Sequence, residues 1–182
     1  CFPSNKFDWL VDFLEDRGID GKGPGESKVL IASQFTKHID LFADRLTTKL
    51  KIPTFVLTGK TNENNRIRMQ REFQRGTMDD GSPAPDVFLL NTKAGGVSLT
   101  LDAADDVVII DSTFVHDDQE QVEDRAHRLS RMHSVQVWNL ASTSSIDESI
   151  LRNTWKMDTS IKKILDGERG IDFAKKLLMD AI

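Results

Sequence analysis

One stretch of the sequence, QVEDRAHRLSR at residues 121–131, concentrates side chains that could bind an anion and act on it. Four of its polar residues share one helical face, because they are spaced at i, i+3, i+4 and i+7: Gln121, Asp124, Arg125 and Arg128. Two neighbouring guanidiniums offer planar forks of donors that match phosphate oxygens. The same pattern is typical of a charged helix surface facing water, where an Asp124–Arg128 pair would contribute only about 0.2–0.5 kcal/mol. The stretch therefore predicts either a phosphate-binding face or a solvated one.

Composition and charge limit the classes of protein to which the chain can belong. Its 182 residues are 38% hydrophobic and 29% charged, which is typical of a soluble globular domain with at most a small appendage. The net charge is −5, so the chain as a whole is not basic, and a contact with nucleic acid would need a local patch of basic residues. Cys1 is the sole cysteine, which excludes a disulfide framework and a cysteine-based metal site.

No targeting or membrane signal is visible in the sequence. The apolar runs are shorter than the roughly 18 residues of a membrane span, and there is no secretory leader. We therefore expect a cytoplasmic or nuclear protein without a membrane partner. Because the chain starts with Cys1 rather than methionine, we expect it to be part of something longer. We assign no metal to three histidines that lack the spacing of metal ligands: His38, His116 and His133.

Short apolar runs alternate with helical patterns along the chain. The runs predict five strands, at 28–33, 54–57, 87–90, 107–111 and 135–141. Apolar residues at helical spacing predict helices at 5–17, 36–50, 61–75, 117–130, from 145 onward and at 171–180. This alternation predicts an α/β domain of three layers, in which helices cover both faces of a mostly parallel sheet. Ligands of such sheets bind beyond the carboxyl ends of the strands.

These patterns divide the chain into three parts. Residues 1–27 hold an N-terminal helix and a glycine-rich linker, residues 28–145 form the α/β lobe, and residues 146–182 form a C-terminal helical extension. The predicted apolar stripe of the first helix consists of Phe7, Leu10, Val11 and Leu14. In the helix at 61–75, Met69 and Phe73 are expected to face inward.

The segment TFVLTGKT, residues 54–61, resembles the end of a phosphate-binding P-loop, GxxxxGK[ST]. Thr54 stands where the first glycine belongs, and residues 55–57 read as a strand. A strand cannot curl its N–H groups around phosphates. An autonomous P-loop NTPase therefore remains only as the alternative enzyme class.

Five blocks occur in an order and at a spacing that resemble one family. KVLIASQF, LTGKT, NTKAGG, VVIIDSTF and QVEDRAHR are similar to successive motifs in the second RecA-like lobe of superfamily 2 helicases, and in particular of the sucrose-non-fermenting (Snf) type of DNA-translocating ATPases. The resemblance covers roughly residues 5–165 and implies a RecA-like fold. It also implies that ATP with Mg²⁺ binds between two lobes, with the metal held by the N-terminal lobe.

The resemblance gives the opening stretch a role in phosphoryl transfer. It implies that Arg128 is the principal arginine finger and Arg125 its partner, since a positioned arginine stabilises the charge that spreads over the γ-phosphate. Four further residues are implied on the nucleotide side: Gln121, Asp124, Gly95 and Gly96. Asp124 would orient the arginines, and the glycine pair would sense both nucleotide and DNA. The alternatives are that the charged residues only brace one another and that the glycines form a tight turn.

The resemblance assigns the DNA side to residues that follow other strands. These are Gln34, Gly59, Thr61, Thr92 and Lys93. Hydroxyls, lysines and backbone N–H groups are the usual phosphate contacts and carry no sequence information, while glycine lets a ligand approach the backbone closely. For the outward arginines of the helix at 61–75, a solvated face is favoured over DNA contact: Arg68, Arg71 and Arg75.

The sequence departs from the family pattern at Ser98, Thr100, residues 114–116, Ser130 and Arg131, which makes it a divergent member. As a whole, the resemblance implies the C-terminal lobe of an ATP-dependent double-stranded-DNA translocase. This helicase-like ATP hydrolase would need the N-terminal lobe of the same protein and the phosphate backbone of double-stranded DNA as partners. The lobe alone is expected to be inactive. The alternative to an enzyme is a DNA- or protein-binding module that kept the fold and lost catalysis.

Overall fold

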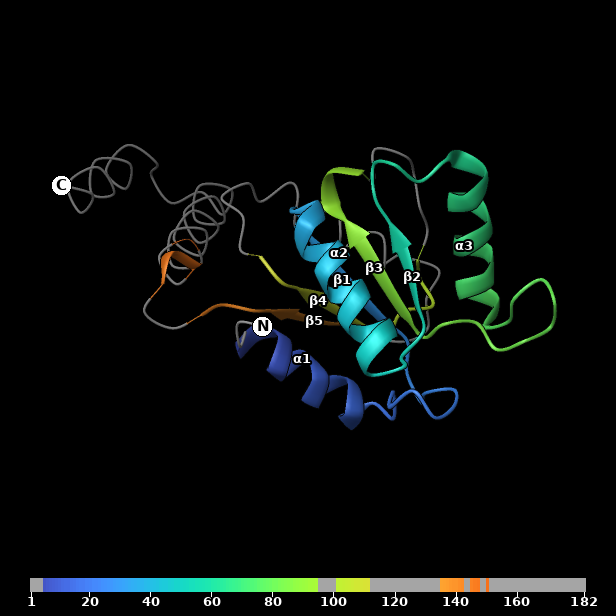
Figure 1. The fold of residues 1–182 in the computed structure, drawn as a ribbon, viewed down its shortest axis with the longest axis horizontal. Helices are drawn as coiled ribbons and strands as arrows, with labels where there is room; N and C mark the ends of the chain where they lie inside the picture. The colour runs from blue at the N-terminus through green and yellow to red at the C-terminus, as the bar shows by residue number, and fades with distance from the viewer. Residues whose placement is uncertain (1–4, 95–100, 112–134, 143–144, 148–149, 151–182) are drawn as a thin grey trace, which may run out of the picture.

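The computed structural model describes residues 5–94, 101–111, 135–142, 145–147 and 150. Five parallel strands form one sheet in the order β2-β3-β1-β4-β5 (Figure 1). The strands are β1 (Val29–Ser33), β2 (Thr54–Leu57), β3 (Val87–Asn91), β4 (Asp106–Ile109) and β5 (Gln136–Asn139). The strand predictions are confirmed in place, with boundaries shifted by one or two residues. In particular, β4 begins at Asp106 and ends before Ile110.

The three central strands are buried on both faces. Every residue of β1, β3 and β4 is buried, because each of these strands has a neighbouring strand on both sides and side chains pack against both faces of the sheet. Successive side chains of β1 alternate between two hydrophobic clusters. Leu30 and Ala32 belong to one, and Val29 and Ile31 belong to the other. The continuous apolar runs thus reflect a sheet covered on both sides, as predicted.

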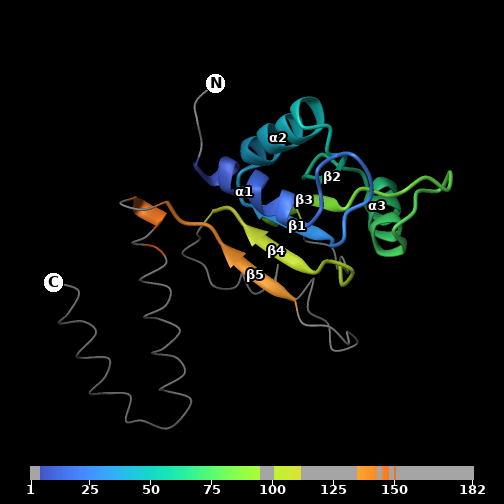
Figure 2. The same cartoon turned by 90° about the horizontal axis from the view of Figure 1, so that it is seen from below.

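Helices cover the two faces of the sheet. Those on one face are α1 (Asn5–Asp16) and α2 (Thr36–Asp44), which Figures 1 and 2 show on the same side, and α3 (Glu63–Arg75) lies beside β2. Met69 and Phe73 of α3 join the cluster of Leu30, whereas Ile39 and Phe42 of α2 join the cluster of Val29. None of the described helices is both long and apolar enough to cross a membrane.

The buried stripe of α1 differs at one position from the prediction. Phe7, Leu10 and Leu14 are buried as expected, but Phe13 is buried in place of Val11. The ring of Phe13 stacks on that of Trp9, with 4.9 Å between the ring centroids, and meets the ring of Trp138 edge-on, with 5.4 Å between the centroids. An aromatic side chain buries more apolar area than valine, so the contact with β5 turns α1 toward Phe13.

The helix predicted at 36–50 changes its geometry partway along. The α-helix ends at Asp44 and continues as a wider π-helical segment, η1 (Arg45–Lys49). The hydroxyl of Thr47 donates to the carbonyl of Ala43 at 2.6 Å, and the hydroxyl of Thr48 donates to the carbonyl of Asp44 at 2.5 Å. Such back-bonding to the preceding turn competes with the helical ladder and bends helices.

The ends of α3 follow from local chemistry. The side chain of Asn62 accepts a hydrogen bond from the backbone N–H of Asn65 at 2.9 Å, which places the first helical residue at Glu63 rather than at the predicted residue 61. Gly76 ends the helix with a φ of 74°, a left-handed conformation that glycine adopts without strain.

Candidate functional site

Five predicted contact residues follow three neighbouring strand ends. Gly59 and Thr61 follow β2, Thr92 and Lys93 follow β3, and Gln34 follows β1. All strands run parallel and the order is β2-β3-β1, so these residues occupy adjacent positions along the carboxyl edge of the sheet. We call these five residues the carboxyl-edge row. Their placement beyond the carboxyl ends of the strands is where open α/β sheets bind ligands.

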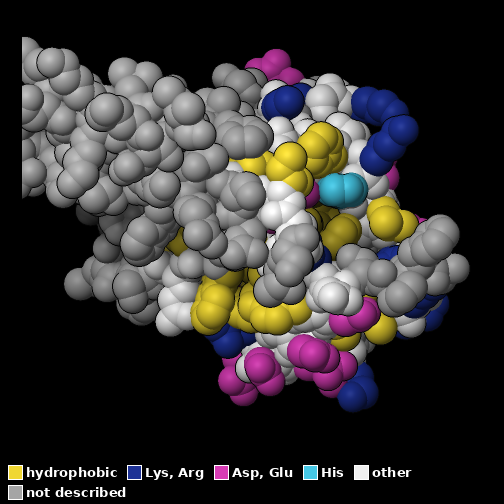
Figure 3. Space-filling view, turned by 90° about the vertical axis from the view of Figure 1, so that its left-hand side faces the viewer, with side chains coloured by type: hydrophobic (Ala, Val, Ile, Leu, Met, Phe, Trp, Pro, Cys, Tyr) yellow, Lys and Arg dark blue, Asp and Glu magenta, His cyan; other side chains and the backbone are white. Residues whose placement is uncertain are grey.

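The surface toward the carboxyl edge is mixed in character. In the space-filling view of this side, a histidine lies among apolar side chains, lysine and arginine side chains stand at the upper right, and acidic side chains gather below (Figure 3). The side chains of Lys60 and Lys93 are exposed, and Phe35, which follows Gln34, is 50% exposed. The edge therefore combines cations with an accessible aromatic ring despite the negative net charge of the chain.

The turn that follows β2 is closed by its own hydrogen bonds. The N–H of Thr61 donates to the carbonyl of Thr58 at 3.0 Å, and the N–H of Thr58 donates to the hydroxyl of Thr61 at 3.1 Å. Nε of Arg66 donates to the carbonyl of Thr61 at 2.8 Å. A Cβ at the exposed Gly59 would meet no atom within 4 Å. The N–H groups of Thr58 and Thr61 are thus already paired within the turn, unlike the donors of the open loop with which a P-loop surrounds phosphates.

The segment that follows β3 begins with a buried asparagine and an unpaired hydroxyl. Asn91 is buried, and its Oδ1 accepts the N–H of Lys93 at 3.1 Å. The hydroxyl of Thr92 is buried and has no hydrogen-bond partner among the residues that the structure describes. Leaving a buried hydroxyl unpaired costs free energy, so a ligand group that reached it would gain by pairing. The predicted Gly95 and Gly96 lie outside the described residues.

A second buried polar cluster joins the ends of β1 and β4. The hydroxyl of Ser33 donates to Asp111 and also accepts the N–H of Phe35 at 3.1 Å. The other carboxylate oxygen of Asp111 lies 3.0 Å from Nδ1 of His38, the half-exposed histidine of α2. Our sequence reasoning missed this cluster. Its one signal was an aspartate closing an otherwise apolar strand run, VVIID.

The predicted nucleotide side falls beyond the described part of the chain. Gln121, Asp124, Arg125 and Arg128 lie within 112–134, a range whose structure is not described, so their roles stay predictions. Within the described ranges, no group of three histidine, cysteine or acidic side chains is arranged to hold a metal ion.

Two of the three outward arginines of α3, Arg71 and Arg75, contact the loop that follows the helix. Nη2 of Arg71 lies 2.6 Å from one carboxylate oxygen of Asp79, and Nη2 of Arg75 lies 3.3 Å from the other. Nε of Arg75 also donates to the hydroxyl of Thr77 at 2.7 Å. These contacts lie at the carboxyl-terminal end of α3, away from the carboxyl-edge row. For Arg71 and Arg75, these contacts are compatible with the solvated face that the sequence favoured over DNA contact.

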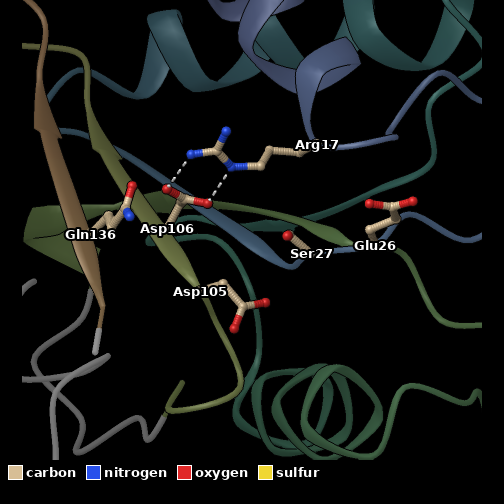
Figure 4. A pocket seen from close by; sticks show the side chains of 6 residues that line it. All are labelled: Arg17, Glu26, Ser27, Asp105, Asp106 and Gln136. Carbon is tan, nitrogen blue, oxygen red and sulfur yellow. Dashed lines mark hydrogen bonds and ion pairs between the residues drawn. The ribbon is translucent and has the colours of Figure 1, made fainter. Parts of the chain in front are cut away.

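A polar pocket of about 520 Å³ opens at the opposite, amino edge of the sheet. It is lined by Arg17, Glu26, Ser27, Asp105, Asp106 and Gln136 (Figure 4). Nε and Nη2 of Arg17 donate hydrogen bonds of 2.8 and 3.1 Å to the carboxylate of Asp106. Nε1 of Trp138 donates to the same carboxylate at 2.8 Å. The hydrogen bond to Asp106 raises the pKa of Arg17 above its ordinary value, against the lowering by burial. These contacts fasten α1 to β4 and β5.

Comparison with known proteins gives consistent matches. Residues 5–130 match the helicase conserved C-terminal domain family. One relative is the SWI/SNF-related matrix-associated actin-dependent regulator of chromatin subfamily A containing DEAD/H box 1 homolog of Drosophila melanogaster. The two sequences are 35% identical over 167 residues, which cover 92% of this chain and 18% of that protein. This chain is 34% identical over 153 residues to the chromatin-remodeling ATPase INO80 of Emericella nidulans, covering 82% of this chain and 9% of that protein.

The fold is also found among solved structures. The crystal structure of the C-terminal part of the Fun30 ATPase domain matches with a TM-score of 0.68 and 33% sequence identity, covering 82% of this chain and 45% of that one. Its likeness agrees with the RecA-like fold expected from the motifs. The chain spans less than a fifth of the length of the two curated relatives described above.

Proposed function

Because this chain belongs to the helicase conserved C-terminal domain family, with SNF2-type chromatin-remodelling ATPases among its relatives, we propose that it is the second ATPase lobe of a longer protein that hydrolyses ATP while moving along double-stranded DNA. The observation that carries this proposal is the carboxyl-edge row. Hydroxyl, amide, lysine and glycine residues at three adjacent strand ends suit contacts with a phosphate backbone. The chromatin-remodelling relatives favour the nucleus over the cytoplasm as its compartment.

The proposed division of labour separates two ligands. The carboxyl-edge row contacts the phosphates of the duplex through groups that carry no base information. Arg128 and Arg125 reach toward the γ-phosphate of ATP, which the first lobe holds together with Mg²⁺, the ion that neutralises part of the phosphate charge. Gln121 and Asp124 line and orient that side, and Gly95 and Gly96 adjoin both ligands. Neither binding site is complete without the first lobe, so ATP turnover needs the longer protein.

The isolated 182-residue chain is expected to show no ATP hydrolysis above the buffer blank, with or without duplex DNA. Its turn at Gly59-Lys60-Thr61 is closed by internal hydrogen bonds and offers no open cradle for phosphates. A phosphate-release assay on the purified chain tests this expectation. If turnover persisted through purification and disappeared on Lys60→Ala, the autonomous P-loop NTPase would be the better account.

Binding of duplex DNA by the isolated chain is expected to be weak and strongly dependent on salt. Each neutralised phosphate contributes roughly −0.9 to the slope of log K against log salt, and the few contacts of the carboxyl-edge row predict a slope of about −2 to −4. Fluorescence anisotropy with duplexes of unrelated sequence, at several salt concentrations, measures both affinity and slope. Tight, salt-resistant binding to a single sequence would instead favour a sequence-reading DNA-binding module.

A further inference from the structure

Asn91 is a buried side chain that holds two exit segments of the sheet together. It is 3% exposed and is the last residue of β3. Its Nδ2 donates to the carbonyl of Gln34 and to the hydroxyl of Thr36, both at 3.2 Å, and its Oδ1 accepts the N–H of Lys93 at 3.1 Å. The orientation of the amide is fixed chemically, because a backbone N–H such as that of Lys93 can only donate.

These bonds begin where the backbone ladder stops. The pairing of β1 with β3 ends at Ser33 opposite Asn91. Beyond this pair, one strand leads through Gln34 into α2 and the other leads through Thr92 and Lys93 into the short 3₁₀ turn η2 (Thr92–Ala94). The side chain of Asn91 therefore extends the connection between the strands past its last backbone pair, to the segments that carry Gln34 and Lys93.

The segment after β1 is also held from its other side. The hydroxyl of Ser33 bonds both Asp111, beyond β4, and the backbone of Phe35, while His38 pairs with the same Asp111. Gln34 thus lies between two buried polar anchors, one from each neighbouring strand. Asn91 also bonds Lys93, so its side chain joins two residues of the carboxyl-edge row.

We infer that Asn91 is a positioning residue, which fixes the spacing between Gln34 and Lys93 so that both meet the phosphate backbone of one duplex at once. The inference rests on the proposed function, because it assumes that these two residues contact DNA. Asn91 itself is buried and acts only through its neighbours. Contacts held in their bound arrangement beforehand avoid the entropic cost of ordering on binding, so loss of Asn91 weakens DNA binding more than chemistry.

The test uses the full-length parent protein, with ATP turnover measured while duplex DNA is titrated. Asn91→Ala is expected to raise the duplex concentration that gives half-maximal stimulation by about tenfold, the change expected when positioned hydrogen bonds are lost. Turnover at saturating duplex should stay within about twofold of the unaltered parent, because the arginines that act on ATP are untouched.

The chain offers a matched control at the opposite edge of the sheet. Asp106 is also 3% exposed, and its side chain also takes part in three hydrogen bonds, which it accepts from Arg17 and Trp138. Asp106→Ala, assayed well below its melting temperature, should leave the half-maximal duplex concentration unchanged. An equal rise in both variants would mean that general loosening of the lobe explains the effect, and would overturn the inference.

A mutant cycle in which Gln34 and Lys93 are replaced together separates positioning from maintenance of the fold. In a parent that already carries Gln34→Ala and Lys93→Ala, the further change Asn91→Ala should no longer alter the half-maximal duplex concentration, since the residues through which it acts are gone. A full additional tenfold rise in that background, or no rise from Asn91→Ala alone, contradicts the inference only. If ATP turnover of the unaltered parent does not change when duplex DNA is added, that result contradicts the proposed function itself.

Discussion

Replacing Arg128 with alanine in the full-length parent is expected to lower ATP turnover by about 10³–10⁵-fold, the range observed for arginine fingers in phosphoryl transfer. The removed guanidinium would stabilise charge on the γ-phosphate in the transition state. Duplex affinity should remain nearly unchanged, because we propose that the carboxyl-edge row, and not Arg128, contacts the phosphates of DNA. Turnover at saturating ATP and DNA, together with anisotropy for DNA affinity, measures the two effects separately.

Two further variants sharpen the arginine experiment. Arg128→Lys should restore little activity, since a point charge cannot replace the bidentate fork of a guanidinium. Arg131→Ala should cost far less, because position 131 departs from the family pattern. The melting temperature of each variant separates unfolding from lost chemistry. If a well-folded Arg128→Ala parent keeps more than about a tenth of its turnover, the loss is far smaller than that expected for an arginine finger. That result would mean that QVEDRAHRLSR is a charged surface facing water.

The largest effect on stability is expected from Asp106→Ala in the 182-residue chain. This carboxylate accepts two hydrogen bonds from Arg17 and one from Trp138, and it is buried. Its removal leaves the guanidinium, whose side chain is 26% exposed, without its main partner. Breaking a largely buried pair in this way costs about 3 kcal/mol, which corresponds to a fall in melting temperature of roughly 6–12 °C for a chain of this length.

An exposed ion pair in the same chain provides the comparison. Arg71 and Asp79 lie 2.6 Å apart, and about half of each side chain is exposed. Pairs of this kind contribute about 0–1 kcal/mol, so Arg71→Ala should shift the melting temperature by no more than roughly 4 °C. Thermal unfolding followed by circular dichroism measures both variants. Equal shifts would show that the cluster of Arg17, Asp106 and Trp138 does not fasten α1 to the sheet.

The layers of the fold could be predicted from local sequence because burial leaves a local pattern. Apolar runs such as 28–33 and 87–90 mark strands covered on both faces. The alternation of these runs with helices is enough to predict one parallel sheet, and hence an edge where residues after the strands gather. The placement of Gly59, Thr92 and Gln34 along that edge follows from the same rule.

The polar contacts that organise the edge could not be predicted in this way. The bond from Asn91 to Gln34 joins residues 57 apart, and the bond from Ser33 to Asp111 joins residues 78 apart. Both depend on which strands are neighbours, and hydrophobic periodicity does not contain that order. The choice of Phe13 over Val11 in α1 has the same origin, because Trp138 of the distant β5 determines it.

We propose that this chain is one lobe of an ATPase whose turnover is stimulated by double-stranded DNA. The most direct test is the steady-state ATP turnover of the full-length parent while duplexes of unrelated sequence are titrated at saturating ATP. Turnover should rise to a plateau of the same height for every duplex, and Arg128→Ala should remove the rise without removing DNA binding. Turnover that is equal with and without duplex, or that responds to one sequence alone, would contradict a lobe that acts on the phosphate backbone of any duplex.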